Sequence, residues 1–271
     1  MSEWETTEGE HWAANADRYT RSLSGYGAIL TEALALTPGE RVLDVGCGCG
    51  DISVAAGRAV GDGGAVHGVD LSAAMLAVAE ARARAASLDQ VRFSRADAAV
   101  WQPDDGPLDV ATSRFGVMFF EDPVAAFANI HTGLRPGGRL VFLCWRDLTV
   151  NDWLFVPGAA VAEVLPLPVG EPGAPGAFAL ADGDRLAGIL ATAGFTDVEL
   201  DEAVAPMWMG RDVDDAVGFL RTTGMGRSLF ADAPNELVAE ATARAAAALA
   251  PHEGADGVVL GGTAWLVRAT A

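Results

Sequence analysis

Short apolar runs alternate with helical segments along the first half of the chain, and this alternation constrains the fold more than any other feature. Each run is bounded by glycine, proline or polar residues. We expect strands at 41–45, 65–69, 91–94, 108–113 and 139–145. Short buried strands joined by helices predict βαβ units and therefore an α/β fold with a doubly wound, mostly parallel sheet.

The second half of the chain is less regular but adds two more strands. We expect them near 198–205 and 264–269, which makes seven strands in all. Helices are expected at 8–23, 28–36, 151–165, 182–193, 212–222 and 234–250. A loop rich in proline and glycine at 166–175 interrupts the pattern without marking a domain boundary.

The carboxyl ends of parallel strands meet at one edge of a sheet, and ligands bind at that edge. Several residues that could contact a ligand come at or just after the expected strand ends: Gly46, Asp70, Asp97, Ser113, Arg114 and Trp145. We therefore expect these residues to lie close together, at the candidate binding site.

Composition excludes several functions. The 271-residue chain has a formal net charge of −19, which disfavours nucleic acid and anionic membrane surfaces as partners. All 18 basic residues are arginine, so the chain has neither a Schiff-base lysine nor a P-loop lysine. Three cysteines without zinc-ligand spacing predict neither a disulfide framework nor a metal site. The acidic start has no apolar signal region, so a cytoplasmic protein is expected.

The glycine-rich turn after the first expected strand narrows the ligand class. A dinucleotide-binding turn has the pattern G-x-G-x-x-G, and here the third glycine position is Asp51. A carboxylate at the start of a helix would face the pyrophosphate of a dinucleotide, which is electrostatically unfavourable. The turn therefore favours a ligand without phosphates.

Five motifs occur in order and at suitable spacing over about residues 40–146. They are Val42-Leu43-Asp44-Val45-Gly46-Cys47-Gly48-Cys49-Gly50, Val69-Asp70-Leu71-Ser72, Ala96-Asp97-Ala98, Leu108-Asp109-Val110 and Leu134-Arg135-Pro136-Gly137-Gly138-Arg139-Leu140. Together they resemble the motifs of class I S-adenosylmethionine (SAM)-dependent methyltransferases. The chain is most similar to the bacterial small-molecule group that includes ubiquinone and menaquinone biosynthesis enzymes.

The resemblance implies a Rossmann-like methyltransferase fold with SAM as cofactor and S-adenosylhomocysteine as product. It also implies an N-terminal helical lid over 1–36 and a SAM-binding domain over 37–271. Helical segments around 148–180 and 210–252 would cover the substrate, and the helices around Phe219 and Phe230 would belong to this cover. The second-half helices are also candidates for self-association into a homodimer.

Residue by residue, the resemblance implies a cofactor site made of Asp44, Gly46, Gly48, Asp70, Leu71, Met75, Asp97, Ala98 and Ser113. Asp70 would accept hydrogen bonds from both ribose hydroxyls, Leu71 and Met75 would flank the adenine, and Asp97 would accept from the exocyclic amine beside the backbone of Ala98. Glycines without a Cβ would let the turn pack against the methionine portion. A structural reading, in which Asp44 and Asp70 only cap or end strands, stays open.

The family has no universal catalytic residue, so acceptor-site candidates come from position alone. His11, Tyr19 and Arg114 are the candidate catalytic residues. The candidate substrate pocket consists of Trp12, Tyr19, Arg114, Phe115, Met118 and Trp145. Each residue has a structural alternative. His11 would be a surface histidine, Arg114 would pair with Asp97 or another acidic neighbour, and the aromatic residues would pack the core.

The expected function is SAM-dependent methyl transfer to a small apolar or aromatic metabolite, with the methylated atom (O, N or C) left open. One alternative is an enzyme that uses bound SAM in a decarboxylation, hydroxylation or cyclisation. The other is a regulator that binds SAM without catalysis.

Overall fold

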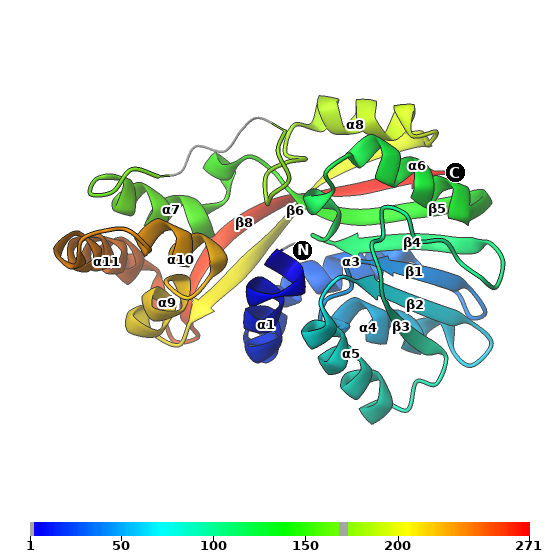
Figure 1. Cartoon of the computed structure of the whole chain (residues 1–271), viewed down its shortest axis with the longest axis horizontal. Helices are drawn as coiled ribbons and strands as arrows, with labels where there is room; N and C mark the ends of the chain where they lie inside the picture. The colour runs from blue at the N-terminus through cyan, green and yellow to red at the C-terminus, as the bar shows by residue number, and fades with distance from the viewer. Residues whose placement is uncertain (1–2, 168–172) are drawn as a thin grey trace.

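A central sheet with helices on both faces forms the larger part of the molecule (Figure 1). The computed structural model describes residues 3–167 and 173–271. The strands are β1 (Arg41–Val45), β2 (Ala65–Asp70), β3 (Val91–Arg95), β4 (Leu108–Arg114), β5 (Leu134–Trp145), β6 (Thr196–Gly210), β7 (Glu253–Gly254) and β8 (Gly257–Thr270). Apart from the two-residue β7, they match the seven expected strands.

Eleven α-helices lie within the described residues. They are α1 (Thr7–Ala14), α2 (Ala16–Ser22), α3 (Ser24–Leu34), α4 (Asp51–Val60), α5 (Ala73–Ala85), α6 (Pro123–Gly133), α7 (Asp152–Ala162), α8 (Gly183–Thr192), α9 (Val213–Leu220), α10 (Gly224–Phe230) and α11 (Asn235–Leu249). Of these, α10 ends at Phe230, around which the sequence analysis placed a helix of the cover without giving its bounds. No helix in the described ranges has the length and hydropathy that crossing a membrane requires.

The strand order confirms the predicted doubly wound, mostly parallel sheet. Along the sheet the order is β3-β2-β1-β4-β5-β8-β6, with β7 paired to β8. The first five strands are parallel, and β8 runs antiparallel between β5 and β6. Helices α3, α4 and α5 pack on one face, whereas α6 and α8 lie together on the other (Figure 1). The carboxyl ends of β1, β2 and β4 therefore share one edge.

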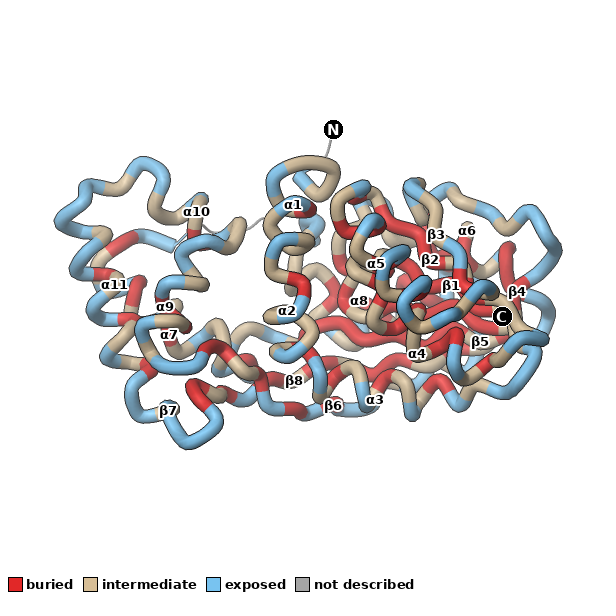
Figure 2. Tube along the Cα trace, turned by 90° about the horizontal axis from the view of Figure 1, so that it is seen from below, coloured by how far each residue is buried: buried red, intermediate tan, exposed pale blue. Residues whose placement is uncertain are grey.

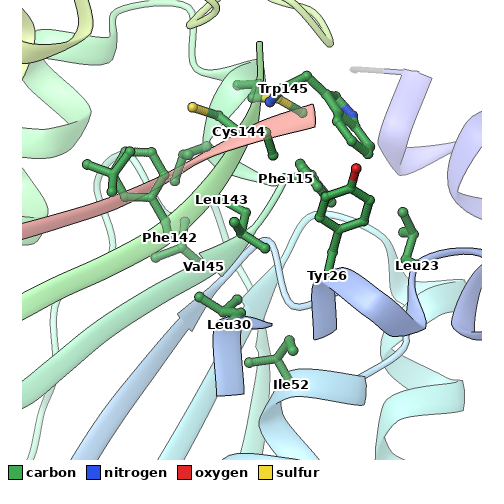
Figure 3. Packing of buried hydrophobic residues seen from close by; sticks show 14 of the residues in the cluster. Leu23, Tyr26, Leu30, Val45, Ile52, Phe115, Phe142, Leu143, Cys144 and Trp145 are labelled. Carbon is green, nitrogen blue, oxygen red and sulfur yellow. The ribbon is translucent and has the colours of Figure 1, made fainter. Parts of the chain in front are cut away.

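The segment expected as a lid divides into two parts. Tyr26, Leu30 and Leu34 of α3 are at most 1% exposed, so this helix belongs to the core. Figure 3 shows Tyr26 and Leu30 pointing into the cluster of buried side chains beside the sheet. Only α1 and α2 lie at the carboxyl edge, where α1 packs against α5. The expected lid over 1–36 is thus too long by the whole of α3.

A second correction concerns the helix expected at 8–23, which is broken at Asn15. Asn15 has φ −115° and ψ 24°, and its side-chain amide donates to the carbonyl oxygen of His11 at 2.8 Å. An asparagine side chain that bonds to nearby backbone competes with helical hydrogen bonds. The break turns α2 away from α1 and brings side chains of the two helices together.

The last two long strands extend well beyond the expected ranges. Strand β8 pairs with β5 only from Ala264 onward, yet it pairs with β6 from Val258 to Thr270. The two strands therefore leave the sheet as a ribbon that carries α7, α9, α10 and α11 at its far end (Figure 1). We call these four helices the distal cluster. Figure 2 shows that it is less buried than the sheet region. The expected cover residues 148–167 and 210–252 thus lie around this ribbon, whereas the N–H of Gly176 donates to the carbonyl oxygen of Met118 after β4. Residues 168–172 of the expected cover and loop lie outside the described residues.

Glycine at the start of α4 is required by both backbone conformation and packing. Gly50 has φ +82°, and a Cβ at this position would lie 2.8 Å from the Cβ of Ala79. Gly61, at the other end of α4, has φ +64°, but a Cβ there would meet no atom within 4 Å. Gly50 is left-handed, with ψ 14°, whereas Gly61 has ψ −171°, a conformation that essentially only glycine adopts. Gly61 is therefore required by its backbone alone, and Gly50 by its backbone and its packing.

We predict that Gly50→Ala destabilises the protein by more than its backbone conformation alone would. The left-handed conformation costs the variant roughly 1 kcal/mol. A steric conflict with α5 costs roughly 1–3 kcal/mol more. Urea denaturation measures the loss of unfolding free energy, and a loss of only about 1 kcal/mol would contradict the packing argument.

Candidate active site

The turn after β1 has the open backbone that the sequence predicted. Gly46 and Gly48 have φ +62° and +53°, a conformation that side chains disfavour. A Cβ on Gly46 would lie 2.9 Å from the Cα of Gly116, which follows β4. The glycine loop (residues 46–50) therefore packs directly against the turn after β4, and its bare backbone lies at the carboxyl edge of the sheet.

Asp70 connects this loop to the end of β2. The backbone N–H of Gly48 donates to its Oδ2 at 2.9 Å, and the N–H of Ser72 donates to its Oδ1 at 2.9 Å. The side chain is nearly buried, and this burial raises its pKa. An ionised carboxylate has about four acceptor positions, so each oxygen keeps one for a ligand hydroxyl.

Asp44, inside β1, is more deeply buried than Asp70. It is 1% exposed, and the hydroxyl of Ser53 donates to its Oδ2 at 2.6 Å. Burial raises its pKa to about 7, against the opposing effect of the positive charge of Arg114. A cationic ligand group beside Asp44 would favour its ionised form.

The other residues expected around the cofactor lie near Asp70. Met75 is buried, and its Sδ would be 3.8 Å from a Cβ on Gly48. The N–H of Ala96 donates to the carbonyl oxygen of Asp70 at 3.1 Å, which holds the end of β3 beside the end of β2. Asp97 and Ala98 follow directly, and Asp97 is exposed while accepting from the N–H of Ala99 at 2.9 Å. Leu71 is the half-buried neighbour of Asp70.

Asp51, the first residue of α4, forms ion pairs with two arginines. Arg114 and Arg82 each place a guanidinium nitrogen 2.8 Å from its carboxylate, and the hydroxyl of Thr20 donates to it at 3.0 Å. Arg114 therefore pairs with an acidic neighbour, which is the structural alternative that the sequence analysis gave for it. Arg82 was missed, because its helix is alanine-rich and its partner lies 31 residues away. The network attaches α2 to the glycine loop.

His11 and Tyr19 come together across the break between α1 and α2. The Nε2 of His11 and the hydroxyl of Tyr19 are 3.1 Å apart, and both rings are half-buried. Tyr19 stacks on Trp12 with ring centroids 3.5 Å apart, and Phe219 of α9 stacks on His11 at 5.6 Å. Burial lowers the pKa of His11 and raises that of Tyr19. The imidazole is therefore neutral at pH 7 and able to accept a proton.

The outer side of α1 and α2 is attached to the distal cluster. Glu8 accepts from the indole of Trp12 at 3.1 Å and forms an ion pair with Arg227 of α10 at 2.7 Å. Arg18 forms an ion pair with Asp215 of α9 at 2.9 Å. Sequence reasoning missed these pairs, because the partners are separated by 219 and 197 residues. Helices α1 and α2 thus connect the distal cluster to the candidate site.

The remaining acceptor candidates belong to the core, which corrects the expected substrate pocket. Phe115, Met118 and Trp145 are at most 8% exposed. Phe115 and Trp145 stack at 4.0 Å, with Tyr26 edge-on to both (Figure 3). Ser113 is fully buried, and its hydroxyl donates to the carbonyl oxygen of Val45 at 2.8 Å and accepts from the N–H of Gly116 at 3.0 Å. These residues shape the wall behind the loop.

The cysteines of the glycine loop have no reactive partner. Burial raises the pKa of Cys49 to about 11 and that of Cys47 well above its ordinary value. Both thiols are therefore protonated at pH 7. Within the described ranges, no three His, Cys, Asp or Glu side chains are grouped as a metal site would require.

Comparison with known proteins points to one family. Residues 42–138 match the family described as a methyltransferase domain. The chain is 34% identical over 106 residues to a demethylmenaquinone methyltransferase from Bacillus mycoides, which covers 39% of this chain and 45% of the relative. The chain spans less than half the length of the curated relatives that it matches.

Solved structures share the fold over most of the chain. The YcgJ protein from Bacillus subtilis has a TM-score of 0.58 at 16% identity and covers 90% of this chain and 97% of its own. Phosphoethanolamine N-methyltransferase 2 from Haemonchus contortus, solved with S-adenosylhomocysteine, has a TM-score of 0.57 at 17% identity and covers 96% of this chain and 57% of its own. At these identities the likeness establishes the fold, which is the Rossmann-like methyltransferase fold expected above.

Asp44 gives the ligand-free protein a specific pH dependence. Its pKa is about 7 when folded and lies near 4 in an unfolded chain, so folding favours its protonated form. We predict that this contribution to stability is full below pH 4 and is lost as the pH rises to 7. The loss is on the order of 2–4 kcal/mol.

Asp44→Asn keeps an oxygen acceptor for Ser53 but cannot ionise, so its unfolding free energy should lack this decline. Urea denaturation between pH 4 and pH 8 measures the effect, with the exposed Asp62→Asn as the control for a lost charge. Parallel pH profiles for Asp44→Asn and the unmodified protein would contradict the prediction.

Proposed function

We propose that this chain binds SAM at the glycine loop and transfers its methyl group to a small organic acceptor. Residues 42–138 match the family described as a methyltransferase domain, which supports this class of reaction. The observation that carries the proposal is the position of Asp70. Its carboxylate is fixed by the N–H groups of Gly48 and Ser72, and it has acceptor positions left for the hydroxyl groups of a sugar.

The charges at the loop fit a nucleoside without phosphates. A helix start normally attracts anions, because free N–H groups and the helix dipole point there. Here Asp51 is the first residue of α4, and its carboxylate carries the ion pairs with Arg82 and Arg114. The carboxylate and the two guanidinium groups neutralise one another at this helix start, whereas the sulfonium and ammonium groups of SAM are cationic and suit the buried Asp44 and Asp70.

We assign the remaining contacts along the same edge. Leu71 and Met75 would flank the adenine, and Asp97 would accept from its amine beside the backbone of Ala98. Gly46 and Gly48 would contact the methionine portion, with Ser113 holding the wall behind them. When bound, SAM supplies a methyl group that is already activated on sulfur. The protein then has to align the acceptor and exclude water.

The acceptor would lie under α1 and α2, where His11 is the candidate base. Its neutral Nε2 lies 3.1 Å from the hydroxyl of Tyr19 in the ligand-free protein. Once the acceptor replaces that hydroxyl, Nε2 can take a proton from a hydroxyl or amine of the acceptor as the new bond forms. Trp12, Tyr19 and Phe219 give this region an aromatic surface, which favours an apolar or aromatic acceptor. Arg114, held by Asp51, is available to an acidic group of the acceptor.

The two alternatives differ from methyl transfer in their products. A methyltransferase releases S-adenosylhomocysteine in proportion to methylated acceptor. An enzyme that uses SAM in a decarboxylation or cyclisation returns it unchanged, and a regulator converts nothing. Quantifying S-adenosylhomocysteine during turnover with a panel of small phenols, amines and enols therefore separates the three functions.

We predict that Asp70→Ala weakens SAM binding by roughly 1–3 kcal/mol through the loss of hydrogen bonds to the ribose. Calorimetric titration measures the change, and Asp62→Ala serves as the surface control. Because Asp70 also holds the loop, circular dichroism must show that the variant is folded. Unchanged affinity in a folded variant would refute the assignment of Asp70.

We predict that His11→Ala lowers kcat by roughly 10²–10⁴-fold and leaves the affinity for SAM unchanged. Tyr19→Phe keeps the stacked ring and should cause a smaller loss of kcat. Since burial lowers the pKa of His11, activity of the unmodified enzyme should fall only in acidic solution, where the imidazole becomes protonated. Unaltered turnover in His11→Ala would exclude His11 as the base. The same conclusion would follow if activity of His11→Ala fell at acidic pH as that of the unmodified enzyme does.

A further inference from the structure

A second hollow lies on the sheet at the edge opposite the glycine loop. It has a volume of about 230 Å³ and is bordered by the starts of β1, β2 and β4, by β3, and by the segment that follows β3. Residues 96–107 form turns and bends without a helix, so a loop covers this part of the sheet. Strands of five or six residues separate the two edges by roughly 15–20 Å. The hollow is therefore distinct from the proposed SAM site.

Two guanidinium groups line this hollow without an acidic partner. Arg41 Nε is one of two buried side-chain nitrogen or oxygen atoms in the described ranges that lack a hydrogen-bond partner. Its terminal nitrogen has only the carbonyl oxygen of Gly106, at 3.4 Å. Arg92 forms no ion pair or hydrogen bond with any described residue. A buried donor without an acceptor is costly, so an anionic group is the partner that the hollow lacks.

Negative charge lines the same hollow. Asp104 and Asp105 belong to the covering loop, and neither forms an ion pair with Arg41 or Arg92. His67 packs against Trp101 with ring centroids 4.6 Å apart, and its Nε2 lies 2.7 Å from the hydroxyl of Ser94. The lining of the hollow thus offers cationic, acidic and aromatic side chains.

We propose that this hollow binds a small zwitterion with the chemistry of a free amino acid. The carboxylate would accept from Arg41 and Arg92, and the ammonium group would lie near Asp104 and Asp105. Trp101 would contact the apolar part. The volume is below the roughly 300–1,000 Å³ of pockets for drug-sized ligands, so the ligand is a small metabolite. A doubly charged anion such as phosphate fits less well, because the two aspartates repel it.

The test is a titration of the full chain with a matched series of probes. L-Leucine carries both charges, 4-methylpentanoate carries only the carboxylate, and 3-methylbutylamine carries only the ammonium group. Inorganic phosphate is the fourth probe. We expect saturable binding of L-leucine, followed by calorimetry or ligand-observed NMR, at least about tenfold tighter than binding of the other three.

Variants assign the binding to this hollow. Arg41→Gln, Arg92→Gln and the double variant Asp104→Asn/Asp105→Asn should each weaken L-leucine binding by about tenfold or more. Arg84→Gln removes an exposed arginine of α5 outside the hollow and should change nothing. Arg92 is exposed, so its variant is informative even if Arg41→Gln does not fold.

Three results would overturn the proposal. They are absence of saturable L-leucine binding, equal or tighter binding of 4-methylpentanoate or phosphate, and full affinity in Arg92→Gln. The titration uses no SAM, so its outcome is independent of the proposed methyl transfer.

Discussion

The carboxylate of Asp70 is the interaction on which the candidate site depends. A carboxyl group this deeply buried is stable only if its oxygens are hydrogen-bonded, and the N–H groups of Gly48 and Ser72 provide those bonds. In doing so they fix the loop after β1 against the turn after β2. The loop in turn needs glycine, because its backbone is left-handed and lies against Gly116. One buried acid thus sets the geometry of two neighbouring strand ends at this edge.

Helices α1 and α2 are attached on both sides by polar contacts. Thr20 and Arg82 connect them to Asp51 beside the glycine loop, whereas Arg18 and Glu8 form ion pairs with the distal cluster. Ion pairs that are partly exposed contribute only about 0–1 kcal/mol each. These pairs therefore stabilise α1 and α2 less than burial in the core stabilises α3, whose aromatic and leucine side chains are at most 1% exposed.

Sequence reasoning succeeded where the signal is local. The apolar runs and the glycine loop depend on neighbouring residues, and the structure has them as expected. It failed where distant segments decide the outcome. The length of β6 and β8 comes from their mutual pairing, and the partners of Arg82 and Glu8 are remote in sequence. Phe115 and Trp145 were placed at the correct edge, but only packing determines that their rings point into the core.

The central claim is that the glycine loop holds a cationic nucleoside without phosphates. Parallel calorimetric titrations of the purified chain with SAM, S-adenosylhomocysteine and NADH test it most directly. Saturable single-site binding of the two sulfur nucleosides, with no heat of binding from NADH, is the predicted result. Saturable binding of NADH in place of both would show that a pyrophosphate is accepted beside Asp51, and would contradict the account.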